Sequence, residues 1–152
     1  MLESEIKVWD MPGTPQKIYN LLKMLTLQAE NIEYVKIYIE KTGTYVSGNS
    51  GTSAAKFARH CGLLEGFLVS FGYRFIEVTP QAWQKFFIGK QVYPKIPKEI
   101  KGKERKRILA KRKTERKNKI KVRSQELCPN LKITLKVSDA VGILAYGENL
   151  SR

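Results

Sequence analysis

The chain has 152 residues, of which 42% are hydrophobic, and it carries 28 Lys or Arg against 14 Asp or Glu, a formal net charge of +14. This length suffices for one domain with a sizeable hydrophobic core. No apolar run approaches the length of a membrane span, and two widely separated cysteines argue against a disulfide framework or a cysteine-based zinc site. We therefore expect one reduced, cytoplasmic domain over residues 1–152, with no membrane partner.

The first part of the chain combines two predicted strands with one helix. Residues 6–9 read as a short strand. Thr14 and Pro15 begin an amphipathic helix that runs to about residue 27, because threonine caps helices and proline suits the first helical position. Apolar and polar side chains alternate over residues 34–40, which predicts a second strand.

A polar loop follows the carboxyl end of this second strand. Residues 42–51 contain three glycines, and a helix is expected over about residues 53–70, ended by Gly72. Ligands of open α/β sheets bind beyond the carboxyl ends of strands, so Glu40 is a candidate metal ligand there. The alternative interpretation is that Glu40 is only an exposed glutamate at the end of the strand, facing Lys41. The apolar stripe of the helix comprises Phe57, Cys61, Leu64 and Leu68.

The second half of the chain adds a strand and three helices. A strand is predicted over residues 73–78, and the helix that follows it carries Trp83. Residues 89–103 contain two prolines and no periodicity, which predicts a loop. A long helix is expected over about residues 104–127, and Ser138 caps the last helix. Strands alternating with helices predict an α/β sheet that is parallel from its second strand onward.

The positive charge is concentrated in one segment of this second half. Residues 90–123 hold 16 Lys or Arg and 3 Glu, a net charge of +13, so the rest of the chain has a net charge of only +1. A basic loop and helix inserted in a nearly neutral domain are typical of a protein that binds a polyanion. The alternative is a solvated lysine-rich helix with no partner. We favour nucleic acid, although charge alone does not separate DNA from RNA or from an anionic membrane surface.

Two motifs resemble those of one nuclease family. A strand ending in IEK, followed after a loop by SGTSAAKFARHCGLLEG, is similar to the second motif of the RuvC-like Holliday junction resolvases, especially the phage and prophage type. The segment SDAVGILAYG looks like the closing motif of that family, in which an Asp followed by Ala opens the last helix and binds metal. The segment VTPQAWQKFF resembles a third family segment. The match to the second motif covers Glu40, Ser53, Lys56, Phe57, Arg59, Gly62, Glu65 and Gly66.

The resemblance implies a ribonuclease H-like α/β fold, with a mixed sheet flanked by helices and a basic helical arm. It also implies a homodimer that cleaves branched DNA, above all Holliday junctions, in a bacterium or a phage-infected cell. Hydrolysis would depend on Mg²⁺, with Mn²⁺ as an alternative, and Glu40 and Asp139 would be the catalytic and metal-binding residues. Two divalent ions about 3.5–4 Å apart can activate water and stabilise the leaving oxygen, and Mg²⁺ prefers carboxylate oxygens. By itself, Asp139 has a plainer explanation, since an acidic residue complements the positive end of a helix.

The motifs and the basic segment together give a set of expected DNA contacts. Tyr45 in the polar loop is placed to stack on an exposed base. Lys136 stands three residues before the last Asp, where the family usually has Asp or His, and it is suited to contact a phosphate. Each basic residue could equally be an ordinary solvated side chain. The expected contacts are Tyr45, Ser53, Lys56, Arg59, Lys85, Lys90, Arg105, Lys106, Arg107, Lys111, Arg112 and Lys136.

The resemblance is incomplete near the start of the chain. RuvC-like resolvases begin with a strand that carries an Asp in an IDPG-type motif, and no segment here matches it. The opening EIKVWDMPGTPQKIYNLL resembles the family's third strand and first helix, so we expect the family's first two strands to be missing. Asp10 stands in the wrong context to replace the missing Asp, on which junction endonuclease activity depends. Two alternatives therefore stay open: a junction-binding protein without a complete metal site, and a generic basic nucleic-acid-binding protein.

Overall fold

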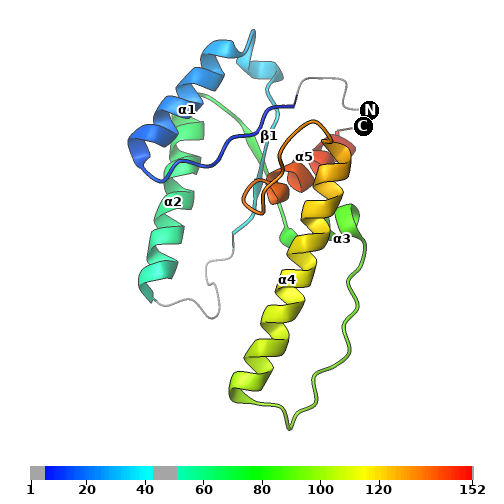
Figure 1. Ribbon diagram of the computed structural model, residues 1–152. Coiled ribbons are helices and arrows are strands. Elements are labelled where there is room, and N and C mark those ends of the chain that lie inside the picture. The colour runs from blue at the N-terminus through cyan, green and yellow to red at the C-terminus, as the bar shows by residue number, and fades with distance from the viewer. Residues whose placement is uncertain (1–5, 43–50, 152) are drawn as a thin grey trace. The chain divides into compact units, whose positions relative to one another are not determined.

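The structure of the chain is a computed structural model that describes residues 6–42 and 51–151 (Figure 1). Two compact units divide it: a sheet unit (Met11–Thr79) and a helical unit (Met1–Asp10 with Pro80–Arg152). Most described residues are helical, and a small parallel sheet accompanies the helices, which confirms the predicted α/β class in its coarse form. The elements in chain order are α1 (Pro15–Gln28), the 3-10 helix η1 (Ile32–Tyr34), β1 (Ile37–Glu40), α2 (Gly51–Ser70), β2 (Phe75–Val78), α3 (Pro80–Ile88), α4 (Gly102–Leu127) and α5 (Ser138–Leu150).

The sheet of the described residues consists of two strands. β1 and β2 run parallel, with Ile37 opposite Phe75 at one end and Glu40 opposite Val78 at the other. The backbone N–H of Lys41 donates to the carbonyl of Val78 at 2.8 Å and extends the pairing by one residue. Parallel strands require a crossover connection, and α2 lies in that connection. The parallel arrangement confirms the prediction and places Glu40 at the carboxyl end of β1.

Three predicted strands differ from the structure, one of them only because the strand predicted over residues 73–78 begins at Phe75. Residues 6–9 lie in no strand of the described sheet, because an alternation of four residues does not form a strand without a neighbour to pair with. The strand predicted over residues 34–40 begins only at Ile37. The side chain of Asn31 accepts a hydrogen bond from the backbone N–H of Glu33 at 2.8 Å and caps η1, so a helical turn replaces the start of that strand.

Helix α2 ends at a glycine, as predicted. Gly72 has a φ of 80°, a conformation that favours glycine. Its N–H donates to the carbonyl of Val69 at 2.9 Å, and the N–H of Tyr73 donates to the carbonyl of Leu68 at 2.9 Å, which is the Schellman arrangement. Leu68 is buried, whereas Phe57 is 45% exposed, so the predicted apolar stripe is buried only toward the carboxyl end of α2.

The core of the sheet unit lies where α1 packs against α2. Ile18 of α1 is 1% exposed. The neighbouring ring of Tyr19 contacts Phe67 of α2, with ring centroids 5.8 Å apart. Tyr73 follows α2 in the chain, and its hydroxyl donates to Oγ1 of Thr26 at 2.9 Å. This buried tyrosine therefore has a polar partner on α1.

The helical unit has its own core, built from α3, α4 and α5, which pack against one another pairwise. Trp83 of α3 is fully buried, and the buried residues around the same three helices include Phe87, Ile120 and Val141. Figure 1 shows the first half of α4 extending away from α3 and α5, with the loop before it running alongside. Only Ile120 and Ser124 of α4 are buried, so most of this basic helix faces solvent.

No helix within residues 6–42 and 51–151 combines the length and the apolar character that crossing a membrane requires.

Candidate nucleic-acid interface and carboxylate site

Asp139 occupies the first turn of α5, where its carboxylate is half-buried. Its Oδ1 atom is buried and has no hydrogen-bond partner among the described residues. Burial raises the pKa of the Asp139 carboxyl, and the positive charges of Lys117 and Arg116 on α4 oppose that rise. An unsatisfied buried carboxylate oxygen is costly and therefore uncommon. The position of Asp139 thus suits a partner that brings a donor or a positive charge to Oδ1.

A buried serine pair fixes the start of α5 against α4. Oγ of Ser124 donates to the carbonyl of Ser138 at 3.0 Å, and both residues are almost completely buried. The prediction that Ser138 caps α5 is wrong: the capping position belongs to Val137, and the hydroxyl of Ser138 donates to the carbonyl of Leu135 instead. Contacts to α4, and not a side-chain cap, therefore hold the turn that carries Asp139.

Glu40 lies at the end of β1, half-buried, in the sheet unit. The neighbouring Lys41 forms an ion pair with Glu77 of β2 at 3.8 Å. Among the residues that the structure describes, no three His, Cys, Asp or Glu side chains gather in a group that could hold a metal ion. The roles of Glu40 and Asp139 as metal ligands therefore stay predictions. Of the two, Asp139 has the surroundings that better suit a cation, because its buried Oδ1 has no hydrogen-bond partner among the described residues.

The basic residues predicted on the first half of α4 differ in their surroundings. Arg105, Lys106, Arg107 and Lys111 are exposed and have no ion pair in the described part of the chain. Arg112 is half-buried, and its guanidinium lies 5.1 Å from the ring centroid of Tyr93 and donates to the carbonyl of Pro94 at 2.6 Å. The hydroxyl of Tyr93 in turn donates to the carbonyl of Arg112 at 3.3 Å. Arg112 thus holds the loop against α4.

Two predicted DNA contacts, Lys85 and Lys90, line one pocket of about 340 Å³ in the helical unit. Arg116 of α4 lines it too and is a basic residue that the sequence did not single out. Arg116 and its Lys and Arg neighbours in the basic segment are chemically similar. Only its position along α4 distinguishes Arg116 from them. The remaining lining residues are Gln81, Gln84, Gly89 and Gln91.

Two further predicted contacts, Lys56 and Arg59 of α2, line a pocket of about 360 Å³ in the sheet unit. His60 lines the same pocket and is half-buried. The other side of this pocket comes from the start of α1. The structure therefore brings Lys56 and Arg59 together beside a histidine.

The other predicted DNA contacts are more scattered. Ser53 is exposed in the first turn of α2. Lys136 forms an ion pair with Asp10 at 3.6 Å, with 79% of the lysine side chain exposed, and exposed pairs of this kind contribute little to stability. Lys136 is therefore accessible to a phosphate. Tyr45 lies outside the described residues. For all these side chains, DNA binding stays a prediction.

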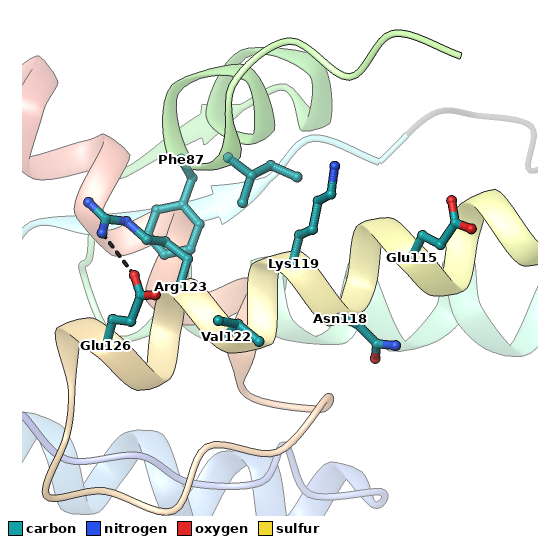
Figure 2. Close-up of a pocket in the computed structure, with 8 residues that line it drawn as sticks. Phe87, Glu115, Asn118, Lys119, Val122, Arg123 and Glu126 are labelled. Atoms are coloured by element: carbon teal, nitrogen blue, oxygen red, sulfur yellow. Dashed lines mark hydrogen bonds and ion pairs between the residues drawn. The ribbon is translucent and has the colours of Figure 1, made fainter. Parts of the chain in front are cut away.

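Another pocket of the helical unit, of about 650 Å³, was not predicted (Figure 2). Figure 2 shows Phe87 pointing from α3 toward α4, and Arg123 paired with Glu126 at 3.0 Å beside it. The α4 residues that line this pocket recur at intervals of three or four, which places them on one helix face. The lining comprises Phe87, Ile88, Glu115, Asn118, Lys119, Val122, Arg123 and Glu126. Its mixed charge makes it a poor surface for DNA.

Comparison with protein-family models, with curated proteins and with solved structures finds no match to this chain.

Proposed function

We propose that this chain is a metal-dependent endonuclease domain for branched DNA, of the RuvC-like type and with a ribonuclease H-like arrangement around β1 and β2. The observation that carries the proposal is the buried, unpartnered Oδ1 of Asp139 at the start of α5. This aspartate stands in the segment SDAVGILAYG, which resembles the closing motif of that family. A carboxylate oxygen without a protein donor suits a divalent cation, since Mg²⁺ binds oxygen ligands.

The chemistry divides between the ion and the chain. When bound, Mg²⁺ supplies an activated water and neutralises charge on the leaving oxygen. Asp139 and Glu40 are the residues that would hold the ions. Lys117 and Arg116, whose charges act on the Asp139 carboxyl, would also attract the phosphate backbone toward it. The backbone of the DNA would contact the exposed residues of α4, including Arg105 and Arg107, and this binding would weaken as salt rises.

A second candidate is a junction-binding protein that does not cleave. The observation that favours it is the lack of any group of three metal-ligating side chains among the described residues. The sequence also has only two aspartates, Asp10 and Asp139. A chain of this kind would keep the basic helix and lose only the hydrolysis.

A junction-cleavage assay separates these candidates. A labelled synthetic four-way junction is incubated with the chain and Mg²⁺, beside a linear duplex and an EDTA control. The endonuclease proposal expects paired, symmetric nicks in the junction, lost in Asp139→Asn and in Glu40→Gln but kept in Asp10→Asn. Because such nicks require two active sites, sedimentation of the complex should give a dimer.

The other outcomes are equally informative. Tight junction binding without nicks would favour the second candidate. Equal affinity for junction, duplex and unrelated RNA would refute both and leave a generic basic nucleic-acid-binding protein.

A further inference from the structure

A pocket of the helical unit combines positive charge, a fixed wall and a lack of acidic groups. We infer that it is a phosphate-binding site, here called the phosphate pocket, lined by Gln81, Gln84, Lys85, Gly89, Lys90, Gln91 and Arg116. Its volume of about 340 Å³ equals that of roughly eleven water molecules at ~30 Å³ each, which is ample for a phosphate group. No Asp or Glu lines it, although α4 carries glutamates nearby, so its three cations face no carboxylate of the lining.

The side of the phosphate pocket formed by α3 presents one face of that helix. Gln81, Gln84 and Lys85 stand at positions i, i+3 and i+4, which lie side by side on a helix surface. Within the described residues, the side chains of these three residues form no hydrogen bond or ion pair. Two amide groups and one ammonium are therefore available as donors to a phosphate in the pocket.

The turn after α3 forms another part of the lining, and the side chain of Gln91 fixes it. Its Nε2 donates to the carbonyl of Ile88 at 2.8 Å and to that of Gly89 at 3.1 Å. Its Oε1 accepts from Nζ of Lys119 at 2.8 Å, which anchors the turn to α4. Gly89 has a φ of 73°, and this left-handed conformation lets the chain turn sharply after α3. The turn therefore needs no rearrangement to hold Lys90 at the pocket, and such preorganisation favours binding.

Arg116 connects the phosphate pocket with the candidate carboxylate site. It lines the pocket, and its charge also lowers the pKa of Asp139 against the effect of burial. A guanidinium binds phosphate through two parallel hydrogen bonds, which an ammonium does not. A phosphate in this pocket would thus lie next to the arginine that influences the predicted metal ligand.

The inferred ligand is a phosphate group, either in a DNA backbone or as a free or terminal phosphate. If the phosphate belongs to a DNA backbone, the inference rests on the proposed function and adds a second point of contact between the chain and the DNA strand. Phosphate binding itself does not require cleavage, so the two ideas can fail separately.

The test uses the full chain labelled with ¹⁵N, titrated with inorganic phosphate and, separately, with a dithymidine phosphodiester. We expect saturable shifts of the side-chain amides of Gln81 and Gln84 and of the backbone amide of Gly89. Lys90→Gln should weaken the binding about tenfold, as expected for loss of a charged hydrogen bond. Lys98→Gln removes the same charge from the same loop outside the pocket, and it should leave the affinity unchanged.

Saturation by the phosphodiester would identify the DNA backbone as the source, and saturation by inorganic phosphate alone would identify a free or terminal phosphate. Shifts that do not saturate with either probe, or that weaken equally in Lys98→Gln, would overturn the inference. Arg116→Gln provides a second variant with the same expected loss, and Arg74→Gln, in the sheet unit, is its arginine control. A negative junction-cleavage result does not affect this titration.

Discussion

Gly142 of α5 lies so close to Trp83 of α3 that a Cβ atom added to the glycine would stand 2.8 Å from Cζ3 of the indole. The same atom would stand 3.2 Å from Cδ1 of Phe87, also on α3. Neither ring can withdraw easily, because Trp83 is fully buried and Phe87 is 7% exposed. Gly142 follows Asp139 by three residues, so the contact that requires glycine also fixes the helix that presents the carboxylate.

Gly142→Ala should therefore destabilise the protein by about 1–3 kcal/mol, the usual cost of overpacking a core. Urea unfolding followed by tryptophan fluorescence measures this loss. Gly66→Ala is the matched control, because a Cβ there meets nothing within 4 Å and alanine favours a helix. An unchanged unfolding midpoint in Gly142→Ala would contradict the close packing of α5 against α3.

The contact between Tyr93 and Arg112 makes a second prediction, about the loop before α4. Tyr93→Leu removes the ring under the guanidinium and the hydroxyl that donates to the backbone. We expect a loss of about 1 kcal/mol and faster amide exchange in the loop, measured by hydrogen–deuterium exchange. Tyr93→Phe keeps the ring and should have a smaller effect. Equal exchange in both variants and the wild type would mean that this contact does not order the loop.

The half-buried carboxyl of Asp139 leads to a third prediction, which concerns how the stability of the protein depends on pH. Burial raises its pKa in the folded protein above that in the unfolded chain. The folded state then binds the proton more tightly, so this group's contribution to the free energy of unfolding falls as pH rises from the unfolded to the folded pKa. In EDTA, Asp139→Asn should therefore melt at a higher temperature than the wild type above that window. The exposed Asp10→Asn serves as control, and a lower melting temperature for Asp139→Asn would refute the assignment.

Metal binding to Asp139 can be observed directly, because the chain contains only two aspartates. In protein labelled with ¹³C at the aspartate carboxyls, Asp139 and Asp10 give separate signals. Mg²⁺ competes with the proton, so it should lower the pH at which the Asp139 signal titrates. Mn²⁺ should broaden that signal at lower concentration than the signal of Asp10. Equal sensitivity of both signals to metal would leave Asp139 as a carboxyl that only complements its helix.

Local sequence signals predicted the elements that depend on local chemistry. Pro15 marked the start of α1, Gly72 the end of α2, and alternation the strand that ends at Glu40. The departures have causes that are distant in sequence or specific to one side chain. Asn31 caps a helical turn that takes the place of the start of a predicted strand, and residues 6–9 alternate but pair with no strand among the described residues. Pairing partners are not encoded within four residues, so this second error could not be avoided from periodicity alone.

In the candidate site, too, some features follow from local sequence and others depend on contacts between distant residues. Asp139 could be proposed as a candidate because the segment that carries it is contiguous, whereas its half-buried state depends on packing that this segment does not show. Composition located the basic segment but could not distinguish its members. Arg112 is held by a loop residue 19 positions away, and Arg116 joins Lys85 from another helix. Such differences among similar side chains arise only when the chain folds.

This distinction among the arginines of α4 makes the last prediction. Removing one side chain that binds a DNA phosphate should lower the slope of log affinity against log salt concentration by about 0.9 for duplex DNA. Arg105 is exposed and unpaired in the described structure, so Arg105→Gln should lower the slope by about that amount. Arg112→Gln should change it less, because that guanidinium already binds the ring of Tyr93 and the carbonyl of Pro94. The measurement is junction binding by fluorescence anisotropy in EDTA at several salt concentrations. Equal reductions in both variants would mean that DNA draws Arg112 away from the loop, and hydrogen–deuterium exchange of the loop in the complex would then increase.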